Sequence, residues 1–146
     1  MKTSVLSRIG AGTVALAAGV TTVVMGPGAA FASDVNPNSA SAICGSGYSV
    51  IDKAVSEGKY YIYLLYNSSN GKNCAVTLKQ SSLGTKTLTD VYLLAENGTS
   101  DEDYGSYTSY AGPVYVSAAN QCIEWGGFTT VSGGTASYNS GWEHCG

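Results

Sequence analysis

The sequence predicts an all-β fold, a small antiparallel β-sandwich or barrel of about seven short strands with two disulfides. From Cys44 onward, apolar and polar residues alternate with period two, which is typical of half-buried strands. Glycine, asparagine, serine and aspartate interrupt the alternation, and the full chain holds 19 glycines. No segment has a convincing amphipathic helical pattern, so strands are expected to form the core.

The N-terminal segment has the parts of a secretory signal peptide. Lys2 and Arg8 form a basic start, an uncharged run covers residues 9–25, and Ala30-Phe31-Ala32 is a small-x-small cleavage site. The run is rich in glycine and alanine, whereas a membrane anchor needs about 20 strongly apolar residues. We therefore expect a secreted, extracellular protein.

Export places the cysteines in an oxidising compartment, where they can form disulfides. The four cysteines allow three connectivities. We favour Cys44–Cys74 and Cys122–Cys145, because sequential pairing links each half without crossing. A zinc site is the alternative, but the sequence has no C-x-x-C pair, and neither a metal nor another cofactor is expected. The expected organisation is a signal peptide at 1–32, a flexible lead-in at 33–43 and a single disulfide-linked β domain at 44–146.

The first half of the domain contains four expected strands. Residues 60–66 are apolar or aromatic at both odd and even positions, so both faces of a strand formed by them would be apolar. This predicts a central strand covered on both faces. Asn70-Gly71 predicts a hairpin turn after it. In the fourth strand Val91 and Leu93 are expected to point inward, and Asp90 falls on the opposite parity. The four strands cover 48–55, 60–66, 73–79 and 88–95.

The second half contains three expected strands. Residues 104–110 alternate tyrosine with small polar residues and are predicted to form one strand. Residues 114–118 and 121–128 are expected to form a final hairpin, because only a short connection separates them. Residues 133–141 are loop-like, and the acidic run 101–103 is expected to be a solvated loop. The pattern does not decide between a sandwich and a barrel.

The charge of the exported part excludes two classes of partner. It keeps five lysines and no arginine against all ten acidic residues, a formal net charge of −5. Nucleic-acid binding needs clustered lysine and arginine to neutralise phosphates, and an anionic membrane attracts the same groups. We therefore expect no nucleic-acid partner, and no membrane partner after signal cleavage.

Tyrosine is the most abundant aromatic residue, with 11 copies, all in the exported part. Most of these rings are expected to pack in the core or at its rim. The strip Tyr104, Tyr107 and Tyr110 is the candidate surface contact, because the residues between its rings are too small and polar for a core face. A polysaccharide or another wall polymer is the ligand that such rings would stack on.

No catalytic signature is present, and we expect no enzyme and no catalytic residue. His144 is the only imidazole, and no G-x-S-x-G turn accompanies it. Glu124 and Glu143 could form carboxylate pairs with the acidic run, but nothing in the sequence sets the spacing that glycoside hydrolysis needs. Calcium binding by residues 101–103 stays open, although the EF-hand arrangement is absent.

Two blocks of the chain are distinctive: residues 107–116 (YTSYAGPVYV) and residues 122–127 (CIEWGG). With them the chain resembles the spore-associated protein A family of streptomycetes and related actinomycetes, from about Cys44 to Cys145. The most specific part of the resemblance is YAGPVYV at 110–116 with the C-x-x-W-G pattern at 122–126. The resemblance implies an exported protein on the spore surface of a sporulating filamentous bacterium and brings no catalytic residues. The acidic run 101–103 departs from what the family leads us to expect.

Together, these features predict a secreted non-catalytic protein associated with the spore or cell surface, structural or surface-binding in role. The expected partners are spore or cell-wall surface components. Self-association is a further possibility if the 60–66 run forms an open edge. The alternative is a secreted binding module or protease inhibitor with a wall polymer or a protease as ligand. Lys72-Asn73, beside Cys74, is then the candidate inhibitory loop, because a pinned loop loses little entropy on binding.

Overall fold

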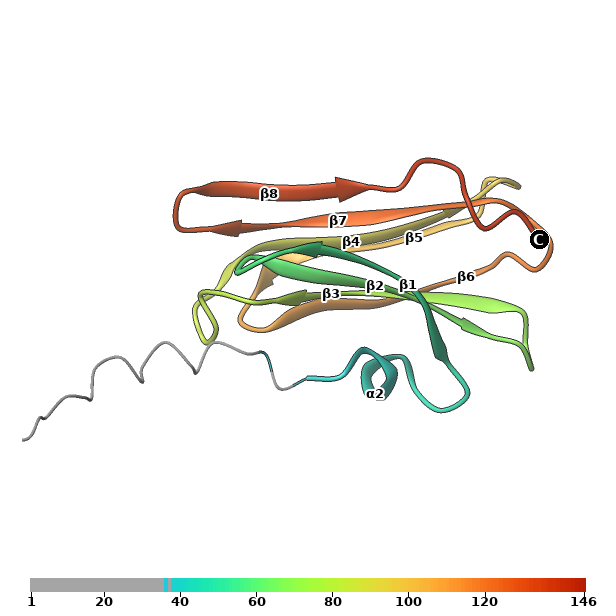
Figure 1. The fold of residues 1–146 in the computed structure, drawn as a ribbon, viewed down its shortest axis with the longest axis horizontal. Helices are drawn as coiled ribbons and strands as arrows, with labels where there is room; N and C mark the ends of the chain where they lie inside the picture. Colours follow the sequence, from blue (N-terminus) through green and yellow to red (C-terminus); the bar gives the residue numbers. More distant parts are fainter. Residues whose placement is uncertain (1–35, 37) are drawn as a thin grey trace, which may run out of the picture. The chain divides into compact units, whose positions relative to one another are not determined.

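The computed structural model describes residue 36 and residues 38–146, so the predicted signal peptide lies outside the described residues. The described part contains two antiparallel four-stranded sheets packed face to face (Figure 1). The predicted all-β fold and both predicted disulfides are confirmed, and the two separate sheets identify a sandwich. Within the described residues, no helix is long and apolar enough to cross a membrane.

In residues 38–146, one short helix precedes eight strands, one strand more than the sequence pattern indicates. The first sheet has the order β1-β2-β3-β6 and the second has the order β5-β4-β7-β8. The elements are α2 (Ala40–Cys44), β1 (Ser49–Ser56), β2 (Tyr60–Asn67), β3 (Lys72–Lys79), β4 (Thr87–Ala95), β5 (Ser100–Tyr107), β6 (Tyr110–Ser117), β7 (Ile123–Val131) and β8 (Gly134–Asn139).

Strand β2 buries side chains on both of its faces, as its sequence predicts. Ile62 and Leu64 point into the core between the sheets, where they meet the inward residues of β4. Leu65 packs with Cys74 and Val76 on the outer face of the first sheet. Because β2 is hydrogen-bonded to β1 and to β3, it is not an edge strand. Residues 60–66 therefore do not form the open edge on which the expected self-association through this run depends.

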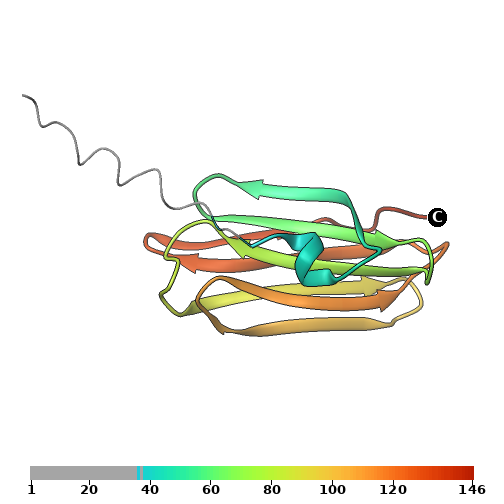
Figure 2. The ribbon, with the colours of Figure 1, turned by 90° about the horizontal axis from the view of Figure 1, so that it is seen from below.

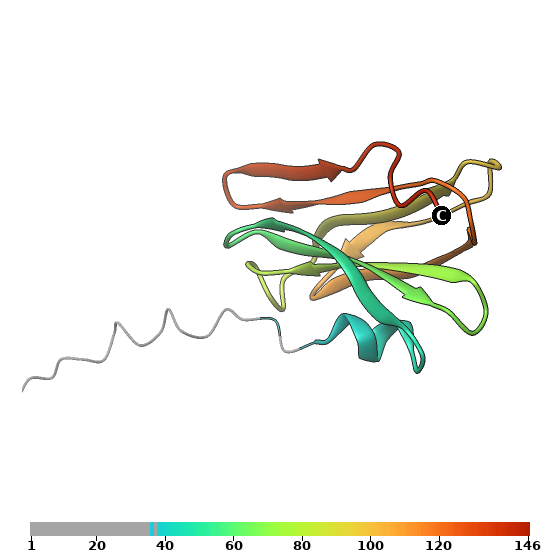
Figure 3. The ribbon, with the colours of Figure 1, turned by 45° about the vertical axis from the view of Figure 1, so that its right-hand side comes forward.

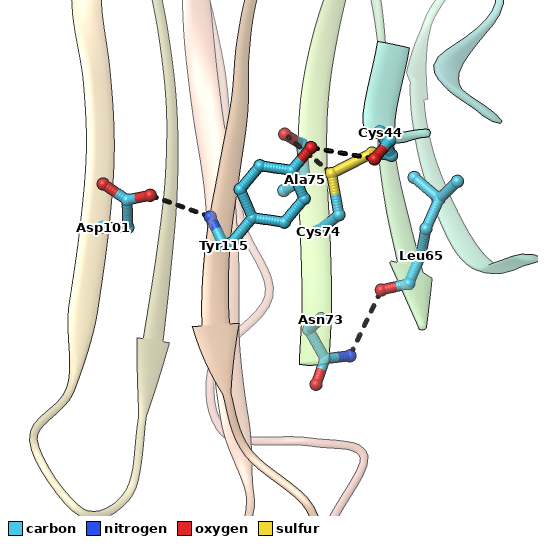
Figure 4. The surroundings of a disulfide bond; sticks show 7 residues. All are labelled: Cys44, Leu65, Asn73, Cys74, Ala75, Asp101 and Tyr115. Atoms are coloured by element: carbon cyan, nitrogen blue, oxygen red, sulfur yellow. Dashed lines mark hydrogen bonds between the residues drawn. A yellow bond between two sulfur atoms is a disulfide. The ribbon is translucent and has the colours of Figure 1, made fainter. Parts of the chain in front are cut away.

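The outer face of the first sheet is covered by α2, which lies across it (Figures 2 and 3). Residues 40–43 of this helix fall in the predicted lead-in at 33–43, whose described part contacts the sheet. Cys44 is joined to Cys74 of β3, and its carbonyl accepts a 2.8 Å hydrogen bond from the hydroxyl of Tyr115 (Figure 4). Asn36 adds side-chain hydrogen bonds to the carbonyls of Lys79 and Ser109. Small polar residues suggested flexibility, but these distant partners fix the segment.

The tyrosine-rich segment 104–110 is not one strand. Strand β5 ends at Tyr107, β6 begins at Tyr110, and the turn between them carries the chain from one sheet to the other. The alternation of residue types continues through this turn, because serine and threonine suit turns as well as exposed strand positions. The local sequence pattern therefore does not show where β5 ends and β6 begins.

The acidic run 101–103 lies within β5 and is not a loop. Asp101 accepts a 2.8 Å hydrogen bond from the backbone N–H of Tyr115 (Figure 4), and Asp103 accepts one of 2.6 Å from Gly112. The two carboxylates thus satisfy backbone groups on the free edge of β6. This stabilisation depends on a strand of the other sheet, which explains why the local sequence suggested a solvated loop.

The predicted final hairpin is also wrong. Residues 114–118 and 121–128 fall in β6 and β7, but β6 pairs with β3 and β7 pairs with β4, in different sheets. The hairpin partner of β7 is β8, which lies within the segment 133–141 that was expected to be a loop. Ser132 and Gly133 form the turn between them, and Gly133 and Gly134 have positive φ values of 105° and 130°.

Candidate functional site

The outer face of the second sheet carries carboxylates and aromatic rings, and no element of the described residues packs across it (Figure 1). This uncovered face is built from the even-numbered positions of β4, β5 and β7, because side chains alternate along each strand. Tyr104 and Leu88 are its exposed large hydrophobic side chains, at 57% and 42%. The members of the uncovered face are Leu88, Asp90, Tyr92, Leu94, Glu102, Tyr104, Glu124 and Phe128.

Asp90 lies on the uncovered face between two aromatic neighbours. It is paired with Tyr104 of β5 and Phe128 of β7, and the centroids of these two rings are 5.9 Å apart. Asp90 is only 5% exposed as a result, and its Oδ1 has no hydrogen-bond partner among the residues that the structure describes. Burial, followed by the nearby carboxylates of Glu102 and Asp103, raises the pKa of Asp90 to about 6. The uncovered face therefore contains a buried carboxylate oxygen, Oδ1 of Asp90, without a hydrogen bond from the described residues, and the carboxylate of Glu102 lies nearby.

Tyr92 forms a second polar group with residues of β7 and β8. Its ring lies against β7 at Gly126, where a Cβ would come within 2.9 Å of the tyrosine hydroxyl and would clash with the carbonyl oxygen of Tyr138, so only glycine fits. Oε1 of Glu124 accepts a 2.6 Å hydrogen bond from Asn139 and lies 3.5 Å from the hydroxyl of Tyr92. Burial and then Glu124 raise the pKa of Tyr92 to about 12, so the hydroxyl keeps its proton.

A depression of about 310 Å³ opens between β4 and β5 beside these groups. Its lining includes Tyr92, Leu94, Ser100 and Glu102. The depression thus offers an aromatic ring, an aliphatic side chain, a hydroxyl and a carboxylate within one small area. Acceptors and donors beside aromatic and apolar surface are the groups that bind a hydroxyl-rich molecule such as a polysaccharide.

The structure separates the predicted tyrosine strip. Tyr104 lies on the uncovered face, but Tyr107 comes three residues later on the same strand and therefore points inward, where it packs against the core. Its hydroxyl donates to Asp103, and this hydrogen bond raises the pKa of Tyr107. Tyr110 is in the other sheet and packs against the apolar cluster beneath α2. Of the three, only Tyr104 belongs to the uncovered face.

The other candidate residues are also dispersed. Asp101 and Asp103 point toward β6 and Glu102 toward the uncovered face, so the three carboxylates of the acidic run do not converge on one cation. Glu124 is on the uncovered face, whereas Glu143 and His144 lie beside Asp52 of β1. The predicted inhibitory residues, Lys72-Asn73, lie within β3 and are paired with β2 and β6, so they do not form a protruding loop.

Sequence reasoning did not select Asp90, Tyr92 or Asp52 as site residues. The sequence gives one signal for Asp90. It alternates with the inward residues of β4, so its side chain is expected to point away from the core. Its burial, however, comes from rings on two other strands, and neither pairing is visible in a single sequence.

A comparison with curated proteins finds one relevant relative, named "Spore-associated protein A", from Streptomyces coelicolor. It is 40% identical to this chain over 143 residues, which cover 97% of this chain and 90% of that protein. No protein-family profile matches the chain. No solved structure matches it either.

Proposed function

Because this chain belongs to the family of spore-associated protein A, we propose that it is an exported, non-catalytic protein that associates with the spore or cell surface. The observation that carries the proposal is 40% identity over 97% of the chain to a protein whose name records association with spores. The signal-peptide pattern at residues 1–32 and the two disulfides support export, because disulfides persist in oxidising compartments.

The uncovered face is the surface through which we expect the protein to bind a wall or spore polymer. It presents the exposed ring of Tyr104, the protonated hydroxyl of Tyr92 and the carboxylate of Glu102 on one face of the second sheet. Sugar hydroxyls can donate to such carboxylates while the sugar ring stacks on the tyrosine. The acidic exported part, with a formal net charge of −5, favours neutral or cationic polymers over anionic ones.

Localisation tests the first part of the proposal. A sporulating culture of the producing organism is separated into cytoplasm, membrane, medium and spore-surface extract, and each fraction is analysed by mass spectrometry. The expected result is a mature polypeptide that begins at Ser33 and is enriched in the spore-surface extract. A protein that keeps residues 1–32 and remains in the cytoplasm would contradict it.

Binding to isolated cell walls and intact spores tests the second part. Tyr104→Ala and Glu102→Gln should each lower the bound fraction several-fold without changing the folded structure, because both side chains are exposed. Val55→Ala is the matched control, since Val55 is an equally exposed apolar side chain (50%) on the first sheet. If all three variants bound equally well, the uncovered face would not be the binding surface. Release of soluble sugar from the walls would contradict a non-catalytic role.

A further inference from the structure

We propose that Asp52, Glu143 and His144 form a binding site for a divalent transition-metal ion, with Zn²⁺ as the best fit. One ligand atom of each side chain lies within 4.8 Å of the other two. Nε2 of His144 is 2.9 Å from Oδ2 of Asp52 and 3.7 Å from Oε1 of Glu143. This site goes beyond the surface role and does not depend on it.

The distances from Nε2 of His144 to the two carboxylate oxygens suit a tetrahedral ion. Zinc binds nitrogen and oxygen at about 2.0–2.1 Å, so neighbouring ligands of a tetrahedral site are roughly 3.3 Å apart. The two distances from Nε2, 2.9 and 3.7 Å, lie on either side of this value. An ion would therefore need shifts of a few tenths of an ångström in the separations of the two oxygens from Nε2. The proton between Nε2 of His144 and Asp52 passes to bulk water when the ion binds.

The donor set selects the class of metal. Two carboxylates and a neutral imidazole carry a charge of −2, which a divalent ion neutralises. Imidazole is a good ligand for zinc, copper and nickel, whereas calcium and magnesium prefer sites made of oxygen alone. The three side chains are 30–40% exposed, which leaves room for water as the fourth ligand.

Hydrogen bonds and a disulfide already orient the three side chains. Oδ1 of Asp52 accepts a 2.7 Å hydrogen bond from the backbone N–H of Lys53, which leaves Oδ2 for the ion. The indole N–H of Trp125 donates to Oε1 of Glu143. His144 precedes Cys145, whose disulfide to Cys122 fixes the end of the chain. Such outer contacts hold ligands in place and increase metal affinity.

The site joins the two sheets on the side of the sandwich away from β5 and β6. Asp52 is paired with Leu64, which faces the core, so its carboxylate points toward the second sheet. Glu143 forms two backbone hydrogen bonds with Ile123 at the start of β7. A bound ion would therefore link the edge strand β1 to the C-terminal segment and stabilise the folded protein.

Isothermal titration calorimetry of the untagged, EDTA-treated, disulfide-bonded protein with ZnCl₂ tests the proposal. We expect one Zn²⁺ per chain and a higher melting temperature with zinc, but no saturable binding of CaCl₂ or MgCl₂. Because the chain has a single histidine, NMR signals of the imidazole report on His144 alone, and its Nε2 signal should shift on zinc addition.

Variants separate this site from other carboxylates. His144→Asn and Asp52→Asn should each weaken zinc binding at least tenfold; asparagine tolerates the φ of 51° at position 144, so the backbone is kept. Glu57→Gln, with the same charge change on an exposed turn, and Asp90→Asn, on the uncovered face, should leave binding unchanged. Absence of saturable zinc binding would overturn the proposal, and so would binding that survives His144→Asn.

Discussion

The two outer faces of the sandwich differ in what covers them. On the first sheet, α2 and the Cys44–Cys74 disulfide bury Leu65, Val76 and Leu78. On the second sheet the corresponding positions remain uncovered, and the burial of one acid, Asp90, comes from neighbouring rings of the same sheet. A short segment that a disulfide joins to one sheet therefore determines which outer face is buried. The other face is then available for a ligand.

The largest expected effect comes from the disulfide that holds the covering segment. Cys44→Ala with Cys74→Ala should lower the free energy of unfolding by about 3.5 kcal/mol, from loop entropy alone, because the two residues are 30 positions apart. Urea unfolding measures this loss. Binding of a hydrophobic dye should increase as well, since α2 loses its anchor above an apolar surface.

The second disulfide is the matched control for this prediction. Cys122→Ala with Cys145→Ala opens a loop of similar size, with a separation of 23, and should cost a similar loop entropy. It anchors no segment over the apolar face, so dye binding should not increase. Equal dye binding by the two double variants would show that the disulfide does not hold the cover.

A pair of leucines compares the faces directly. Leu65→Ala removes a fully buried side chain beneath α2 and should cost about 3 kcal/mol in the free energy of unfolding. Leu88→Ala removes a side chain of the uncovered face that is 42% exposed and should change stability by less than about 0.5 kcal/mol. Thermal or urea unfolding of both variants measures the difference. Similar losses would mean that an unseen element covers the second sheet.

The smallest effect, and the one specific to the uncovered face, concerns Asp90. Its pKa is about 6 in the folded protein and about 3.9 in an unfolded chain, so the folded state binds more protons between these values. The free energy of unfolding should therefore decrease as the pH rises from about 4 to 6. The two-unit shift corresponds to at most about 2.7 kcal/mol.

Asp90→Asn removes this ionisation and keeps the size of the side chain. The variant should be more stable than the parent protein at pH 7, and its unfolding free energy should lack the decrease contributed by Asp90 between pH 4 and 6. Urea unfolding at several pH values measures both effects, with Glu57→Gln as an exposed control. A pH profile identical to that of the parent protein would show that Asp90 is not buried as described.

The local sequence accounts for many individual elements. Alternation predicts the inward residues Val91 and Leu93, and apolar residues at both parities predict that 60–66 is a central strand. The Asn70-Gly71 turn correctly predicts the hairpin of β2 and β3. These features depend on residues that are close together in the chain, so a single sequence contains them.

Period-two alternation and turn residues act locally, so the amino-acid pattern alone predicts an all-β, disulfide-linked domain and the inward faces of several strands. Three other features arise only in the folded protein: β6 and β7 lie in different sheets, Asp101 and Asp103 accept hydrogen bonds from the edge of β6, and Asp52 contacts His144. Each of these features depends on hydrogen bonds or burial supplied by residues far away in the chain.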